Sequence, residues 1–238
     1  TDIEIAVPEM LDVLPPGMLA RGPIGWVVKS LKVLGVDLHG LSATKIARKI
    51  EEKVKGESRP GPGFYRCRLE TGAFALEKPP SMEKIDGERI LLFLHGTASS
   101  TWGSFGDLWS EARRGELNRI RSCYQGNVYA FEHRSLTESP IENARDLVSC
   151  LAALPKDTTV DLVSHSRGGL VGELLCRVTT LGRENGNPNR AAAFDERDFA
   201  LFNAAPEQAG NRAALQALAV ALGNARFRIG RFVRVACP

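Results

Sequence analysis

The residues with the clearest chemical potential form the segment S-H-S-R-G-G at positions 164–169, in which Ser166 is followed two residues later by Gly168. The apolar segment Val160–Val163 before it predicts a short buried strand, and Leu170–Val178 after it has the pattern of a helix. A serine at a sharp bend between a strand and a helix is held in a strained conformation that requires small neighbours. The segment therefore predicts a nucleophile elbow, with the Ser166 hydroxyl at the positive end of the following helix.

A second motif, L-H-G-T at positions 94–97, ends the apolar run Ile90–Leu94. A histidine and a glycine after a buried strand allow the chain to turn back over the sheet, which brings the backbone N–H of Thr97 or of Ala98 toward the elbow. The N–H of Arg167, directly after the bend, points at the same space. Well-placed donors of this kind each stabilise an oxyanionic transition state by about 3–4 kcal/mol. The two motifs together predict a serine nucleophile beside an oxyanion hole.

The pair of motifs resembles the α/β-hydrolase superfamily, close to its lipase-like and esterase-like branches. The resemblance covers residues 64–238 and implies Ser166 as the nucleophile, with the amides of Arg167 and Thr97 as oxyanion donors. One departure is Ser164, where the superfamily usually has glycine; serine is small enough to fit there. The remaining motif residues would shape the two turns: His95, Gly96 and Gly168.

The triad acid and histidine that the resemblance implies are not found at their expected places after the nucleophile. All four histidines precede Ser166: His39, His95, His133 and His165. His165 is the variable residue of the elbow, His95 belongs to the oxyanion turn and His39 lies in the N-terminal part, which leaves His133 as a weak candidate for the base. Three acids follow the elbow in a polar segment and are expected to be surface charges: Asp195, Glu196 and Asp198.

Two interpretations of this gap stay open. In the first, the triad acid and histidine come from sequence after Pro238 or from another chain or domain that completes the fold. The start at Thr1 and the predicted buried strand just before Pro238 favour this interpretation. In the second, the protein is a pseudo-hydrolase without a base, and a serine hydroxyl without a base is a poor nucleophile at neutral pH.

The function hypothesis is therefore a serine hydrolase that cleaves esters, thioesters or amides of a small-molecule or lipid-like acyl substrate through an acyl-enzyme. No cofactor and no metal are implied. The alternative is a non-catalytic module on the same fold that binds or regulates a protein partner, for example as a protease substrate in a larger assembly.

The elements that must position these motifs alternate between strands and helices, which predicts an α/β fold with a mostly parallel sheet covered by helices on both faces. This is a truncated α/β-hydrolase core. A hairpin around Thr71-Gly72 precedes it, and the pair Ser139-Pro140 predicts a helix start, with the helix running to Leu151. The predicted hairpin strands are Phe64–Leu69 and Phe74–Glu77, the buried strands Ile90–Leu94, Asn127–Phe131, Val160–Val163 and Phe232–Ala236, the later helices Leu170–Val178 and Pro206–Leu222, and the polar loop Gly182–Pro188.

Residues 1–62 are predicted to form a helical extension before the core at residues 63–238. Apolar residues recur at helical spacing within residues 24–34, and Ser42 is a candidate N-cap for a helix that continues to Val54. The run R-P-G-P-G at residues 59–63 breaks the chain and marks the boundary.

Composition excludes several other classes. The chain has 238 residues, is 43% apolar and 25% charged, and has a net charge of +3, which is too small to argue for nucleic-acid binding. It has no apolar run of about 18 residues, so no transmembrane segment is expected. The five cysteines are odd in number and have neither C-x-x-C nor zinc-ligand spacing, which favours a reduced, cytoplasmic protein.

Overall fold

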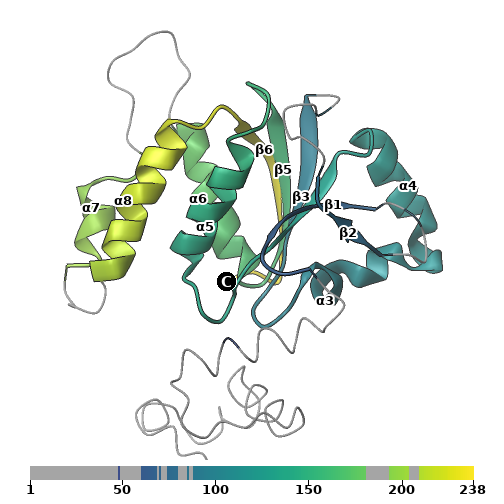
Figure 1. Ribbon diagram of the computed structural model, residues 1–238, viewed down its shortest axis with the longest axis horizontal. Coiled ribbons are helices and arrows are strands. Elements are labelled where there is room, and N and C mark those ends of the chain that lie inside the picture. The colour runs from purple at the N-terminus through teal and green to yellow at the C-terminus, as the bar shows by residue number, and fades with distance from the viewer. Residues whose placement is uncertain are drawn as a thin grey trace, which may run out of the picture.

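The computed structural model describes residues 48, 60–68, 70, 74–79, 85, 88–180, 193–203 and 209–238 (Figure 1). The helices predicted within residues 24–34 and 42–54 lie outside this part of the chain, apart from Arg48. The polar loop predicted at Gly182–Pro188 also lies outside it, as do Thr71-Gly72 and the first residues of the helix predicted from Pro206. All five cysteines are described and all are free thiols, so no disulfide joins them.

A six-stranded mixed sheet forms the centre of the fold, with the strand order β2-β1-β4-β3-β5-β6. Strands β4, β3, β5 and β6 run parallel, whereas β1 is antiparallel to both of its neighbours. The predicted hairpin and the predicted α/β class are therefore both present. The strands are β1 (Gly63–Cys67), β2 (Leu76–Glu77), β3 (Arg89–Leu94), β4 (Val128–Glu132), β5 (Thr159–His165) and β6 (Arg228–Val235).

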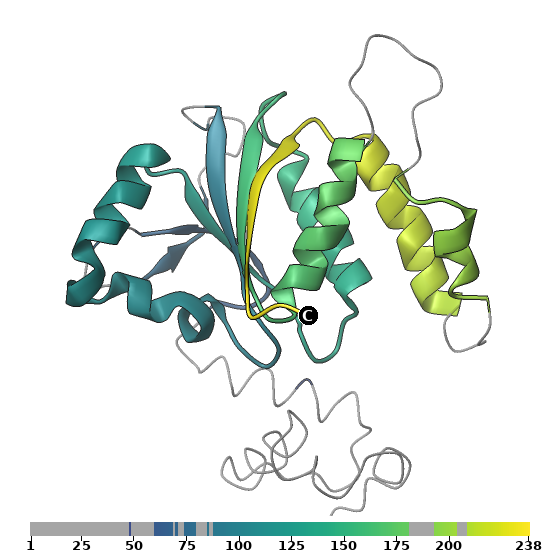
Figure 2. The same cartoon turned by 180° about the vertical axis from the view of Figure 1, so that it is seen from behind.

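Helices α5 (Pro140–Leu151), α6 (Gly168–Thr180) and α8 (Ala209–Gly223) cover one face of the sheet. Side chains alternate along a strand, so Leu92 and Leu94 of β3 point to this face. They pack there against helix residues such as Leu147 and Leu175. Figures 1 and 2 show the three helices side by side, with the short helix α7 (Glu196–Ala200) beyond α8.

The opposite face is covered by the segment between β3 and β4. It contains α3 (Thr101–Phe105), the 3-10 turns η2 (Gly106–Trp109) and η3 (Glu111–Arg113), and α4 (Arg114–Cys123). Leu91 and Phe93 of β3 point to this side and pack against Trp109 and Leu117. The sequence did not predict these elements.

The N-terminus of α5 lies where the sequence predicted it. The Ser139 hydroxyl accepts the Glu142 backbone N–H at 3.2 Å, and the Glu142 carboxylate accepts the Ser139 N–H at 2.7 Å. This reciprocal capping box satisfies two N–H groups that would otherwise have no partner in the helix. Pro140 occupies the first helical position, where its missing N–H costs nothing.

The prediction of a fourth buried strand at Phe232–Ala236 was wrong in its burial. The strand spans Arg228–Val235 and lies at the end of the strand order, with β5 as its partner. Val233 is 52% exposed and Val235 is 45% exposed. Both lie on the face that α3 and α4 cover, but these helices pack over β1, β3 and β4 and do not bury the side chains of β6. An apolar strand sequence thus predicts that the segment pairs into a sheet. It does not predict whether a layer of helices covers its side chains.

Candidate functional site

Ser166 lies on a tight turn between β5 and α6, in a conformation that non-glycine residues rarely adopt. Its φ angle is +49°, and left-handed conformations cost L-residues about 1–2 kcal/mol. The turn is fixed by two backbone hydrogen bonds of 2.9 Å each, from the Ser166 N–H to the Val235 carbonyl and from the Gly169 N–H to the Ser166 carbonyl. The structure therefore has the sharp strand-to-helix bend that the sequence predicted at this serine.

The glycine two residues after Ser166 is required by a backbone-to-backbone contact. A Cβ atom on Gly168 would lie 2.4 Å from the Leu94 carbonyl oxygen and 2.6 Å from that of His95. Both oxygens belong to the end of β3, so the start of α6 packs directly on the loop that follows this strand. Ser164 is fully buried, and its hydroxyl lies 3.2 Å from the Cys237 thiol, so the serine is accommodated where glycine was expected.

The loop after β3 reaches the elbow at Gly96. A Cβ atom on Gly96 would lie 3.0 Å from the Cβ of Ser166. Two residues later, Ala98 also has a left-handed conformation, with φ +48°. Two strained non-glycine residues therefore lie on the two loops that meet here, and such strain persists only where the surrounding structure enforces it.

Of the two amides considered as oxyanion donors in this loop, that of Ala98 is already engaged. Its N–H donates to the Ser135 hydroxyl at 2.8 Å. The Thr97 N–H has no hydrogen-bond partner in the described part of the chain, and Thr97 is exposed. The Ala98 amide is therefore occupied, whereas the Thr97 amide is available for a ligand. Arg167, the other expected donor, directly follows Ser166, and its guanidinium donates to the Glu138 carbonyl.

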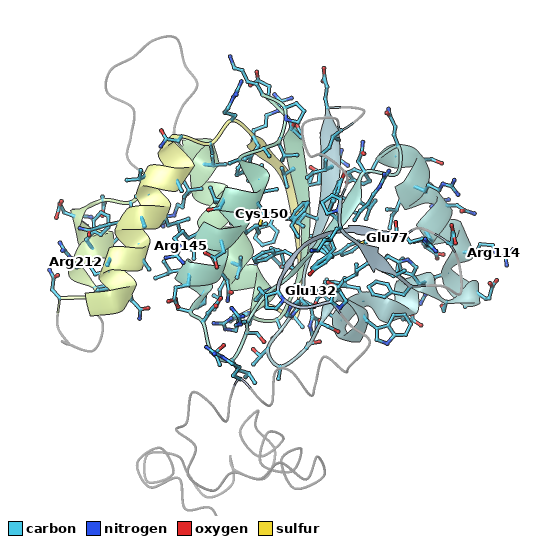
Figure 3. The ribbon with its side chains drawn as sticks, in the orientation of Figure 1. Glu77, Arg114, Glu132, Arg145, Cys150 and Arg212 are labelled. Carbon is cyan, nitrogen blue, oxygen red and sulfur yellow. The ribbon has the colours of Figure 1, made fainter. Side chains whose placement is uncertain are left out.

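The end of β4 holds the loop after β3 in place. The buried Glu132 accepts the Thr101 N–H at 2.8 Å, next to the hydrogen bond from Ala98 to Ser135. Figure 3 labels Glu132 at the end of the sheet where α3 also lies. This role could not be predicted from local patterns, because Glu132 is an acid within an apolar strand and its partner is 31 residues away in the chain.

His95 shapes this loop and is not placed to act as a base. Its Nε2 accepts the His133 backbone N–H at 3.1 Å, so the ring proton lies on Nδ1, which donates to the Gly96 carbonyl at 2.9 Å. The rings of His95 and His133 stack at 4.0 Å, and both residues are buried. The expected role of His95 in the turn agrees with this geometry.

The other histidines do not reach the Ser166 hydroxyl either. His133 is 1% exposed, and its ring stacks on those of His95 and Phe131. His165 points toward α3, with its ring 6.4 Å from that of Phe105. No hydrogen bond joins Ser166 Oγ to a histidine in the part of the chain that the structure describes, and His39 lies outside that part.

The acids after the elbow belong to the start of α7. The Asp195 carboxylate accepts the backbone N–H groups of Arg197 at 2.8 Å and of Asp198 at 3.1 Å, and these bonds, that of Asp198 first, lower its pKa. Asp195 and Glu196 are exposed and Asp198 is partly exposed, as expected for surface charges. Their role is to cap a helix.

A buried carboxylate that the sequence analysis missed lies on β5, away from the elbow. Asp161 accepts the Tyr124 hydroxyl at 2.8 Å and the Arg231 backbone N–H at 2.7 Å, and Arg89 Nε lies 3.6 Å away. The bond to Arg231 falls where the pairing of β5 and β6 is irregular. Asp161 therefore stabilises a bulge in β6, and its partners account for its burial.

The position of the two loops in the sheet is typical of a binding site. The connection after β3 crosses one face to reach β4, and the connection after β5 crosses the other face to reach β6. In sheets of this kind, ligands bind outside the carboxyl ends of neighbouring strands whose connections diverge in this way. The H-G-T turn and Ser166 lie at these two strand ends.

The fold and the site define an α/β protein with a strained serine at the switch point of its sheet. The chain belongs to the family described as "Domain of unknown function (DUF7379)", whose model matches residues 65–193 and so includes both loops. Comparisons with curated proteins and with solved structures found no match.

Two further features are absent from the part of the chain that the structure describes. No helix there is long and apolar enough to cross a membrane. No group of three or more His, Cys, Asp or Glu side chains there is arranged to hold a metal ion.

Proposed function

We propose that this protein is an α/β-hydrolase-like serine hydrolase, in which Ser166 attacks an acyl carbon and forms an acyl-enzyme. The observation that carries the proposal is the left-handed backbone of Ser166, with φ +49°, on a turn packed against the Leu94 and His95 carbonyls. Such strain at a polar, partly exposed residue has no evident structural benefit, and it is the conformation that a nucleophile elbow requires.

The chemistry would follow the general route of acyl transfer. Ser166 Oγ bonds to the carbonyl carbon while a general base removes the hydroxyl proton. The negative charge that develops on the carbonyl oxygen is stabilised by the amides of Thr97 and Arg167. The tetrahedral intermediate then collapses, and the leaving group departs with the proton from the protonated base. A water molecule, activated by the same base, hydrolyses the acyl-enzyme.

The base and the triad acid would come from sequence beyond this chain or from a partner chain. The histidines that the structure describes are engaged or oriented elsewhere. The elbow lies beside the end of β6, because the Ser166 N–H donates to the Val235 carbonyl.

The proposal is tested by turnover of p-nitrophenyl butyrate by residues 1–238 and by the longest reading frame that contains them. We expect a burst of p-nitrophenol from the longer protein, equal to one equivalent of enzyme, and no burst from its Ser166→Ala variant. Ser149→Ala is the matched control, because Ser149 is exposed on α5 and its hydroxyl donates within that helix to the Arg145 carbonyl. A folded longer protein with no turnover of any activated ester would overturn the proposal.

The second candidate is a non-catalytic pseudo-hydrolase that binds a protein or a small molecule through the same fold. It is favoured by the absence, within the described residues, of a hydrogen bond between Ser166 Oγ and a histidine. If the longer protein shows no turnover and no acyl-enzyme, this candidate replaces the first.

A further inference from the structure

An apolar groove of about 390 Å³ lies next to the elbow, between α5, α6, Phe202 after α7 and Asn211 of α8. Its volume is within the range of about 300–1,000 Å³ that is common for small-molecule sites. The first residues of α5 and the first two turns of α6 form its walls. Its main lining residues are Pro140, Ile141, Leu170, Leu174 and Phe202.

The groove begins within one helical turn of the proposed nucleophile. Leu170 follows Ser166 by four residues, which is about 6 Å along a helix axis. Arg167 joins the two walls at this end, because its guanidinium donates to the Glu138 carbonyl, directly before the Ser139 cap of α5. The Leu170 side of the groove and the elbow therefore lie at the same end of α6, with the hydrogen bond from Arg167 to Glu138 beside them.

The side chains that line the groove indicate which class of ligand it would bind. Among the described residues that line it, the one charged side chain is Glu173, whose carboxylate is already paired with Arg234 at 3.1 Å. None of these described lining residues is basic, so they would not stabilise a negatively charged group. Leu170 remains 39% exposed although it lines an apolar surface. An uncharged hydrocarbon chain would cover this side chain and remove it from water.

We propose that this groove binds the hydrocarbon part of an acyl chain whose carbonyl carbon lies at Ser166. This inference rests on the proposed function for the position of the carbonyl group, and it narrows the substrate class to esters or thioesters of aliphatic acids. The acyl chain lies along α5 and α6, with its carbonyl end at the start of α6 and its apolar end toward Phe202.

The test measures binding and does not require turnover. The fluorescence of cis-parinaric acid, a straight-chain fatty acid probe, is titrated with the chain of residues 1–238. Leu170→Glu places a second carboxylate in the groove and should weaken binding at least tenfold. Leu201→Glu is the matched control, because Leu201 is 72% exposed and does not line the groove, and it should change the affinity less than twofold.

A second variant distinguishes loss of the groove from loss of the fold. Leu170→Trp keeps the position apolar but fills the groove, and it should also weaken binding, while circular dichroism checks the fold of each variant. Absence of probe binding by the wild-type chain, or equal affinities of Leu170→Glu and Leu201→Glu, would overturn the inference. Ser166→Ala should bind the probe like the wild type. Probe binding that depends on Leu170 in a protein that forms no acyl-enzyme would refute the proposed function alone.

Discussion

Replacement of Gly168 by alanine tests the contact that holds the elbow against the loop after β3. The new Cβ would lie 2.4 Å from the Leu94 carbonyl oxygen, well inside the 3.0 Å below which Cβ contacts essentially do not occur. The obstructing atoms are backbone atoms at the end of a central strand, paired on both sides with β4 and β5. They cannot rotate away as a side chain could. Overpacking of this kind typically costs 1–3 kcal/mol, and we expect about 3 kcal/mol for Gly168→Ala.

The matched control is Gly115→Ala in α4, where an added Cβ would meet no atom within 4 Å. Alanine is the better helix former, so this variant should be more stable than the wild type by about 0.5–1 kcal/mol. Urea unfolding at 25 °C, followed by circular dichroism, gives the free energy of unfolding of both variants. If Gly168→Ala is as stable as Gly115→Ala, α6 does not pack on the β3 loop as described, and the support for a constrained Ser166 is lost.

Three further predictions concern the rest of the fold. Burial and the hydrogen bond to Asp161 raise the pKa of Tyr124 to about 12, so its contribution to stability is complete below pH 10 and is lost as the pH rises from 10 through 12. Thermal unfolding of Tyr124→Phe should therefore depend less on pH in that window than unfolding of the wild type. Ser139→Ala should lower the free energy of unfolding by about 1 kcal/mol through loss of the α5 cap, as measured in urea. Asp161→Asn should cost about 3 kcal/mol in the same assay, because it leaves buried donors without a carboxylate; a loss below 0.5 kcal/mol would contradict the role given to Asp161.

Much of the α/β core could be predicted from local patterns. The strands β3, β4 and β5 are short apolar runs, and Ser139-Pro140 is a strong signal for the start of α5. The segment from Thr101 to Cys123 could not be predicted in the same way. Trp109 and Leu117 are its large side chains that become fully buried, and the charged residues around them hide any regular apolar period.

The environment of β6 could not be predicted from its apolar run because burial depends on neighbours elsewhere in the chain. Arg228, Arg231 and Arg234 recur at every third position along this strand. Charged side chains are a common feature of edge strands, so they were a usable signal for its position.

The candidate site could be predicted at the level of its two turns, because an elbow is defined by residues close together in sequence. The hydrogen bond from Ala98 to Ser135, which excludes one of the two amides considered in the loop, spans 37 residues. The bond from Thr101 to Glu132 spans 31 residues. Both hydrogen bonds form because β4 lies beside β3 in the sheet. This strand order depends on the whole fold and cannot be predicted from the spacing of residues close together in sequence.

The central claim is that Ser166 is a nucleophile, and covalent labelling tests it most directly. The longest reading frame that contains residues 1–238 is treated with a fluorophosphonate, and the adduct is located by peptide mass spectrometry. We expect a single adduct at Ser166, absent from Ser166→Ala and unchanged in Ser149→Ala. No adduct on the folded protein, or an adduct that persists in Ser166→Ala, would contradict the account.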